Sequence, residues 1–297
     1  MRRGRFVAQL VLRCLLVPAV ALSVVLLAAS SPARAQAPLP DLIVNQQILQ
    51  NHWIVRDEDF LSTTCSVQEG GVTPGTHRVL RFTVNTPNIG NSNLALGDPN
   101  THVAPINDGL YEFATCHRHF HFRHYTLDEL IDPRTGFAWR VAKRGFCMID
   151  VLPAPPNLGG PPPGSPVFRS CGRVGIPGNQ GIKAGWADEY IWFLGGQYFV
   201  LDGGDGQPPV PPGTYIIRVT VNPGFIPSGG PDDPCRFADP NHTGVCHQLP
   251  ESNYENNVAQ AIVNIPDHPG RGGVGPGVND PPGPPGERDE HGDLIEP

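Results

Sequence analysis

The chain has 297 residues, which is enough for one large domain or two small ones. It carries 21 Lys and Arg against 28 Asp and Glu, and without the five arginines of its first 35 residues the remaining 16 against 28 give a formal charge of −12. Such a chain has no basic surface that would hold a polyanion, so nucleic acid is excluded as a partner.

The first 35 residues predict a signal peptide. The basic start "MRRGRF" precedes the apolar run "CLLVPAVALSVVLLAAS", and the cleavage pattern Ala33-Arg34-Ala35 follows. The alternative, a membrane anchor, is disfavoured because the run is short and small residues follow it. We therefore expect an exported protein, secreted, periplasmic or at the cell surface, with no stable membrane anchor after cleavage.

Strand-like patterns dominate the chain after this segment. Residues 78–90, 213–223 and 256–265 alternate apolar and polar side chains, and residues 189–201 are rich in aromatic and β-branched side chains. Turn signals rich in Pro and Gly separate these runs. "TLDELID", residues 126–132, is the only helix-like piece. We predict a mainly β protein, a β-sandwich with immunoglobulin-like strands, long Pro/Gly-rich loops and little helix.

The C-terminal end has a different composition. From Pro266 on, the chain consists largely of Pro, Gly and acidic residues, so it cannot bury enough apolar surface to offset the entropy lost on ordering. Residues 266–297 are therefore predicted to form a disordered tail. Residues 36–265 are predicted to form one domain with its own core.

Six cysteines remain once the signal peptide is removed. An even number in an exported chain predicts disulfides, and the sequence alone leaves fifteen complete pairings open. The six are Cys65, Cys116, Cys147, Cys171, Cys235 and Cys246.

The stretch "ATCHRHFHFRHY", residues 114–125, holds three histidines in strict alternation: His117, His119 and His121. In a strand these side chains share one face, and imidazole suits copper, zinc, iron and nickel, so the stretch predicts a metal site. In a straight strand the outer two would lie about 13 Å apart, so the segment must bend for all three to converge. His124 breaks the alternation and is expected near the site or on the surface.

This stretch resembles the copper-binding segment of the lysyl oxidase family, a Cys followed by His-x-His-x-His. That family builds a quinone, lysine tyrosylquinone, from its own lysine and tyrosine, and both have counterparts here. "KRGFC" places Lys143 four residues before Cys147, as in the family. "GWADEYIWFLGGQY" contains the family pattern Gly-x-x-Asp-x-Tyr, with Tyr190 followed by Gln197 at the matching distance. The resemblance covers most of residues 40–265.

The resemblance implies that the predicted domain is catalytic. It implies Cu²⁺ held by His117, His119 and His121, and lysine tyrosylquinone formed from Lys143 and Tyr190. The implied reaction is oxidative deamination of a primary amine by molecular oxygen, which gives an aldehyde, ammonia and hydrogen peroxide. The amine is a small molecule or the lysine side chain of an extracellular protein.

Two proton transfers need further residues. Alternation along the strand places Asp188 on the same face as Tyr190, so Asp188 is our candidate for the base that removes the substrate's α-proton; alternatively it holds a loop or binds a ligand. Lys143 must lose its proton before it adds to the oxidised ring. Its pKa, ~10.4 in free lysine, must be lowered by burial or nearby cations, for which Arg140 and Arg144 are candidates.

The resemblance also implies a disulfide pairing, Cys116 with Cys171. Cys235 and Cys246 would then close a short loop within an apparent insertion, residues 228–249. Cys65 and Cys147 remain, and we infer that they pair with each other, since the local partners of their family counterparts are missing here.

Other interpretations stand beside the oxidase. The closing "PESNYENN" also resembles the end of an immunoglobulin-type adhesion module, so a secreted metal-binding adhesion protein without quinone is the alternative function. Lys183 competes with Lys143, and Tyr198 competes with Tyr190. A periplasmic copper carrier is disfavoured because Met1 and Met148 are the only methionines.

Overall fold

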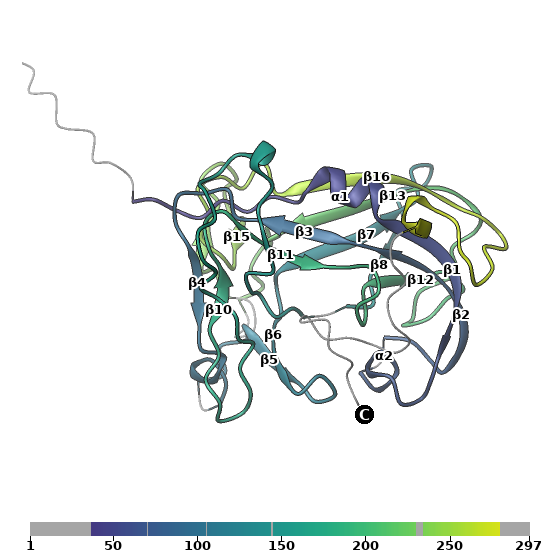
Figure 1. Cartoon of the computed structure of the whole chain (residues 1–297), viewed down its shortest axis with the longest axis horizontal. Coiled ribbons are helices and arrows are strands. Elements are labelled where there is room, and N and C mark those ends of the chain that lie inside the picture. The colour runs from purple at the N-terminus through teal and green to yellow at the C-terminus, as the bar shows by residue number, and fades with distance from the viewer. Residues whose placement is uncertain (1–36, 70, 105, 144, 230–233, 280–297) are drawn as a thin grey trace, which may run out of the picture. The chain divides into compact units, whose positions relative to one another are not determined.

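Strands dominate the structure, a computed structural model, and the prediction of a mainly β protein is confirmed (Figure 1). The described residues are 37–69, 71–104, 106–143, 145–229 and 234–279. From Pro38 on, they belong to one compact unit. The predicted signal peptide lies outside the described residues. Among the helices of the described residues, none is long and apolar enough to cross a bilayer.

The strands are divided among six small sheets in the described part of the chain. The three larger sheets have the spatial orders β16 (Val258–Ile265), β13 (Gly213–Val221), β7 (Thr126–Ile131), β8 (Ala138–Arg140); β1 (Trp53–Phe60), β2 (Gly75–Phe82), β12 (Tyr198–Val200); and β3 (Val84–Pro87), β11 (Trp186–Tyr190), β9 (Leu152–Pro153). The strand pairs are β4 (Leu94–Gly97) with β10 (Gln180–Ile182), β5 (Tyr111–Ala114) with β6 (His119–Phe122), and β14 (Phe237–Ala238) with β15 (Cys246–His247). The two-layer sandwich therefore stays a prediction.

Helical segments are short. They are the α-helices α1 (Gln46–Asn51) and α2 (Cys65–Gln68) and the 3₁₀ turns η1 (Pro99–Thr101), η2 (Pro156–Leu158) and η3 (Pro276–Asn279). The side chain of Asn45 caps α1 by accepting hydrogen bonds from the backbone N–H groups of Gln47 and Ile48.

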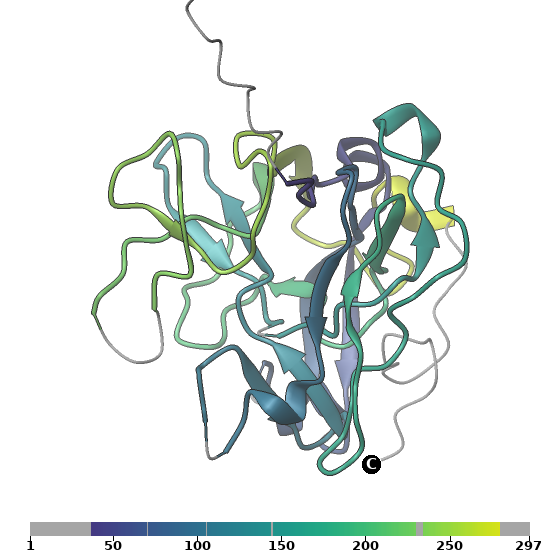
Figure 2. The same ribbon diagram turned by 90° about the vertical axis from the view of Figure 1, so that its left-hand side faces the viewer.

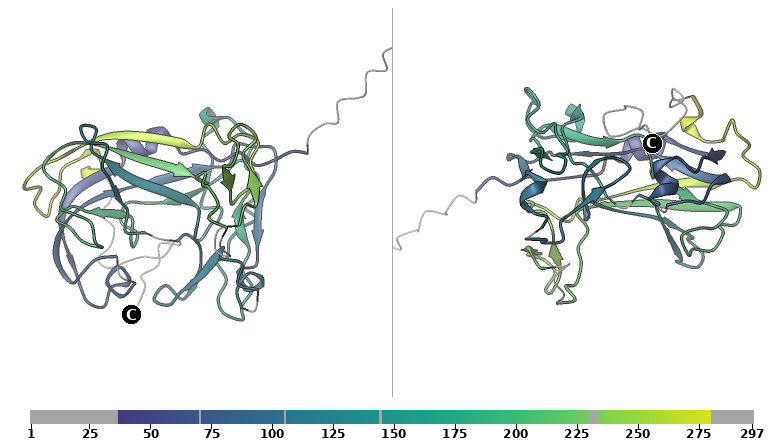
Figure 3. Two further views of the ribbon diagram at one scale, coloured as in Figure 1. Left: turned by 180° about the vertical axis from the view of Figure 1, so that it is seen from behind. Right: turned by 90° about the horizontal axis from the view of Figure 1, so that it is seen from below.

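The sheet of β16, β13, β7 and β8 shows why alternation in the sequence predicted strands. In β13 every second side chain from Tyr215 to Val221 is buried, and in β16 every second one from Ala259 to Ile265. Burying each large aliphatic side chain contributes about 1.5–3 kcal/mol, which fixes the register of the pair. Figure 3 shows β16, β13 and β7 side by side when seen from behind.

Residues 126–132, expected to be helix-like, are instead mostly strand. β7 pairs antiparallel with both β13 and β8, so it lies inside the sheet. Asp128 and Leu130 are buried at alternating positions, which is the period of a strand and not of a helix. Pairing on both edges outweighs the modest helix propensity of a seven-residue segment.

Two of the three expected disulfides are wrong. Cys65 pairs with Cys116, and Cys147 pairs with Cys171, in place of Cys116–Cys171 and Cys65–Cys147. The third, between Cys235 and Cys246, is confirmed and joins two residues that are 11 positions apart in the sequence. It lies in the yellow-green loop around β14 and β15, which projects to the left in Figure 2.

The side-chain amide of Gln180 explains the pairing of Cys147 with Cys171. This amide is fully buried, accepts a hydrogen bond from the N–H of Met148, and donates to the carbonyls of Phe120 and Cys171. It thereby fastens three separate segments to one another, with Cys147 and Cys171 at their meeting point. A pairing carried over from a resemblance contains no information about this local network.

The predicted disordered tail differs from the structure over its first part. Residues 266–279 are described, and Val274 exchanges two backbone hydrogen bonds with Val55 of β1, at 2.8 and 2.9 Å. Gly273 and Gly275 permit this approach, because a Cβ on Gly275 would lie 2.5 Å from the carbonyl oxygen of Trp53. Backbone pairing thus holds this segment in place although its two valines, Val274 and Val278, are about half exposed. Residues 280–297 lie outside the described residues.

Candidate metal and cofactor site

The three alternating histidines lie on the β5–β6 hairpin. β5 and β6 pair with Ala114 opposite His119, so residues 115–118 form the connecting turn. The N–H of Arg118 donates to the carbonyl of Ala114 at 2.7 Å, and Arg118 has φ +60°, an uncommon value for a side-chain-bearing residue. His119 and His121 lie on the strand and His117 in the turn. The bend that convergence requires is therefore located at Arg118.

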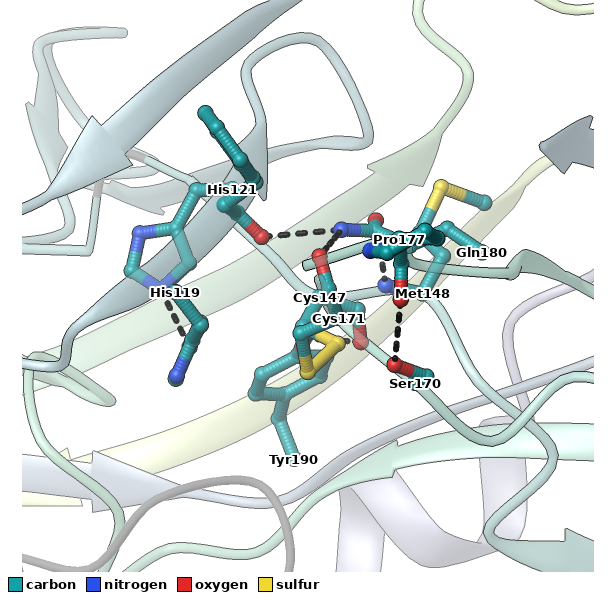
Figure 4. Close-up of a disulfide and its surroundings, with 10 residues drawn as sticks. His119, His121, Cys147, Met148, Ser170, Cys171, Pro177, Gln180 and Tyr190 are labelled. Carbon is teal, nitrogen blue, oxygen red and sulfur yellow. Dashed lines mark hydrogen bonds between the residues drawn. A yellow bond between two sulfur atoms is a disulfide. The ribbon is translucent and has the colours of Figure 1, made fainter. Parts of the chain in front are cut away.

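The three imidazoles converge. The Nε2 atoms of His119 and His121 are 3.1 Å apart (Figure 4), and the ring centres are separated by 4.9, 5.2 and 5.7 Å. Two nitrogens bound to one ion at ~2.0–2.1 Å would lie about 2.8–3.4 Å apart, and their ring centres about 4.5–5.5 Å apart. Two of the three centre separations fall in that range and the third exceeds it slightly. The ring spacing is therefore close to that of three imidazoles on one metal ion, and His117 is the ring that would have to move closer to the other two.

Burial supports the same interpretation. His119 and His121 are 6% and 4% exposed, and the side chain of His117 is 7% exposed. Three buried imidazoles packed side by side have little use as surface groups, whereas a shared metal ion would account for their burial. His124 follows the strand, is half-buried and lies outside this set.

Lys143 and Tyr190 lie together. The Nζ of Lys143 is 4.7 Å from the centre of the Tyr190 ring and 5.3 Å from that of Phe146. An ammonium over an aromatic face is favourable, so this contact holds the two predicted cofactor precursors together. Tyr190 is 1% exposed, and its hydroxyl donates to the carbonyl of Cys147 at 2.8 Å (Figure 4). The Cys147–Cys171 disulfide thus anchors the carbonyl that orients the tyrosine.

Of the two competing residues, Lys183 has a partner elsewhere, whereas Tyr198 lines the same cavity as Lys143. Lys183 donates from Nζ to the carbonyl of Ser165 at 2.6 Å. Tyr198 is fully buried, packs on Phe60 with ring centres 5.2 Å apart, and has the guanidinium of Arg81 4.8 Å from its ring centre. The contact between Lys143 and the Tyr190 ring agrees with the motif spacing, and the choice of this pair over the competitors stays a prediction.

Asp188 is fully buried in β11, two residues before Tyr190, and alternation along that strand puts both side chains on one face. The sequence predicted this placement. Neither residue is among the described residues that line the neighbouring cavity.

Of the two cations expected beside Lys143, one has no supporting contact here and the other stays untested. Arg140 is exposed on β8, and Arg144 lies outside the described residues. The structure instead places the carboxyl of Asp128 near Lys143. Burial raises the pKa of Asp128 to about 7, and the nearby Thr126 hydroxyl and the charge of Lys143 offset only part of this rise. Asp128 was not among the predicted site residues because its segment was expected to be helix-like; its alternation with Leu130 is the signal that points to a strand.

A cavity of about 320 Å³ opens beside these groups. Its wall includes His117, His121 and Lys143, together with two carboxylates, Glu69 and Glu112. This size suits a small ligand, and two carboxylates beside imidazoles and an amine favour a cationic one.

Two glycines shape the cavity wall. A Cβ on Gly145 would lie 2.6 Å from the Cβ of His121, and Gly196 has φ +76° with Lys143 beside it. A larger residue at either position would displace a predicted site residue.

A second group of possible metal ligands lies in the projecting loop: Asp239, His242 and Glu255. The side chains of His242 and Glu255 are 56% and 53% exposed. Asp239 already accepts hydrogen bonds from the N–H groups of Asn241 and His242 at 2.7 and 3.1 Å, so it stabilises its own turn. This group serves as a comparison for the buried triad.

Comparison with known proteins adds independent information. The family model "Lysyl oxidase" matches residues 40–228, more than half of the chain. Protein-lysine 6-oxidase of Rattus norvegicus is 25% identical over 251 residues, covering 78% of this chain and 48% of that protein. The Sus scrofa protein of the same name is 26% identical over 251 residues and 79% of its length. Lysyl oxidase homolog 2 of Homo sapiens is 26% identical over 200 residues, 63% of this chain and 22% of that protein. The chain spans about half the length, or less, of the first curated relatives it matches. It belongs to the lysyl oxidase family.

Proposed function

We propose that this protein is an exported copper-dependent amine oxidase. It converts a primary amine, oxygen and water into an aldehyde, ammonia and hydrogen peroxide. Its substrate is a small amine or the lysine side chain of an extracellular protein, and the name of two relatives, protein-lysine 6-oxidase, supports a protein lysine. The observation that carries the proposal is the placement of the Lys143 amine over the Tyr190 ring in a domain that also gathers three buried histidines.

His117, His119 and His121 are the proposed ligands of Cu²⁺, and Lys143 and Tyr190 are the proposed precursors of lysine tyrosylquinone. When present, copper supplies the oxidation of the tyrosine ring by oxygen, and the quinone supplies the electrophile that takes up the substrate amine. The fit of the imidazoles and the lysine–tyrosine contact support this assignment.

The remaining residues handle position and protons. The carbonyl of Cys147 and the ring of Phe146 hold Tyr190 in place, the latter with ring centres 4.9 Å apart. Asp128 is the candidate acceptor of the proton that Nζ of Lys143 must lose, because the charges of the two groups interact and burial raises the pKa of Asp128 to about 7. Asp188 is the candidate base for the substrate's α-proton because it shares a strand face with Tyr190.

The test is hydrogen peroxide release by copper-loaded protein across a panel of primary amines, with phenylhydrazine labelling of the quinone. His119→Ala is expected to abolish copper binding at the triad, labelling and peroxide release. The matched control is His242→Ala in the exposed loop group, which should leave all three unchanged. Copper-loaded protein that neither labels nor releases peroxide would favour the adhesion module, whose support is the closing "PESNYENN" segment.

A further inference from the structure

A carboxylate lies against the outer side of the histidine cluster. Oε2 of Glu69 is 2.9 Å from Nδ1 of His117, a close contact whose direction falls short of a linear hydrogen bond. Oε1 of the same carboxylate accepts from the N–H of Cys116 at 3.3 Å. Glu69 thus touches the backbone of one residue and the ring of the next. Its side chain is 30% exposed, so one edge faces solvent and the other faces His117.

A covalent link delivers this carboxylate to the hairpin. Glu69 follows α2, and its N–H donates to the carbonyl of Cys65, the first residue of that helix, at 2.8 Å. Cys65 forms the disulfide with Cys116, the residue before His117. A single helical turn therefore separates the cross-link from the carboxylate, and the turn that carries Glu69 is tied directly to the turn that carries His117. The pairing expected from the resemblance would not have brought them together.

The contact determines which nitrogen of His117 is available to a metal. An imidazole that binds a metal through one nitrogen commonly directs the other at a carboxylate or carbonyl, which fixes ring orientation and tautomer. With Nδ1 facing Glu69, Nε2 is the atom left to bind. His119 and His121 also approach each other through Nε2. Nε2 is therefore the nitrogen that His117 has available for a metal, the same atom through which His119 and His121 approach each other.

We propose that Glu69 is a positioning residue of the metal site, held in place by the Cys65–Cys116 disulfide, which fixes the His117 ring so that its Nε2 completes the set of ligands. The proposal rests on the proposed function, since it assumes that the histidine triad binds copper. It adds a residue that the histidine motif does not contain. Glu69 belongs to a separate segment, 47 residues before Cys116.

The test is the copper affinity of Glu69→Gln, measured by competition with a chromophoric chelator. Gln keeps the size of the side chain and removes its charge, so the metal-free protein should retain its unfolding temperature. Copper binding should weaken about 10–100-fold, the usual effect of losing such a partner. The matched control is Glu129→Gln, since Glu129 also bonds a basic side chain, Arg218, on a different sheet; its copper affinity should equal that of the original protein.

A second variant tests the link itself. Replacing both Cys65 and Cys116 with Ser frees the turn that carries Glu69 and should also weaken copper binding. Electron paramagnetic resonance of bound Cu²⁺ should change in Glu69→Gln and stay the same in Glu129→Gln. Glu69→Gln with copper affinity within twofold of the original protein would overturn the proposal. If His119→Ala also leaves the affinity unchanged, the proposed metal site itself is wrong, which separates the two failures.

Discussion

Replacing Asp128 with Asn should make the protein more stable at alkaline pH and leave it nearly unchanged in acid. Asp128 is 2% exposed in β7, and its pKa is raised from 3.8 to about 7, mainly by burial. Between these two pH values the folded protein holds this proton more tightly than the unfolded chain does. The free energy of unfolding therefore falls as pH rises through this window, because keeping the buried carboxylate charged costs energy.

The expected size follows from the two pKa values. At 1.36 kcal/mol per pH unit, the difference between about 7 and 3.8 corresponds to about 4 kcal/mol at pH 8. Asn has nearly the same shape and does not ionise, so Asp128→Asn should gain on the order of 4 kcal/mol over the original protein at pH 8. The two proteins should converge near pH 4.

The assay is urea unfolding of metal-free protein at several pH values from 4 to 8. Asp132→Asn is the matched control, because bonds from Arg134 lower the pKa of Asp132 and its loss should give no alkaline gain. Copper-loaded Asp128→Asn should form the Lys143–Tyr190 link more slowly, since the proton acceptor is gone. If the free energy of unfolding depends on pH in the same way for Asp128→Asn and the original protein, the argument that this carboxylate is held in an unfavourable environment is refuted.

Two further predictions concern stability. Burial alone would raise the pKa of Glu58, but the guanidinium groups of Arg81 and Arg56 outweigh it and lower the pKa to about 2. The ionised Glu58 should therefore add about 3 kcal/mol to the free energy of unfolding above pH 4.5, and this contribution is lost as pH falls toward 2. Glu58→Gln should remove this acid dependence in unfolding experiments. Replacing both Cys147 and Cys171 with Ser opens a loop of 24 residues and should lower the free energy of unfolding by about 3 kcal/mol, because the unfolded chain is no longer restricted. An unchanged unfolding midpoint would contradict this expectation.

Local pattern predicted the parts of the fold and site that depend on short stretches of sequence. Alternation placed β13 and β16 correctly, because a half-buried strand leaves a two-residue period in its own sequence. The histidine triad was found in the same way. The contact between Lys143 and Tyr190 followed from motif spacing within a known family, since the two segments are 47 residues apart and no local pattern joins them.

Long-range packing decided the rest. Asp128 was missed because its seven-residue segment has helix-forming residues, and only pairing with strands far along the chain makes it a strand. Glu69 carries no motif, and a disulfide between two remote segments brings it to His117. The cysteine pairing itself depends on buried hydrogen bonds of Gln180. Each of these features arises from contacts between distant segments, and such contacts leave no periodic pattern of apolar and polar residues in the local sequence.

The central claim is that Lys143 and Tyr190 become one cofactor, and peptide mass spectrometry of copper-loaded protein tests it most directly. A cross-linked pair of peptides should appear, heavier by one oxygen and lighter by four hydrogens than the two peptides together. It should vanish in Lys143→Arg and Tyr190→Phe and persist in Tyr198→Phe. Fully copper-loaded protein that yields both peptides unmodified and releases no peroxide with any primary amine would contradict the account.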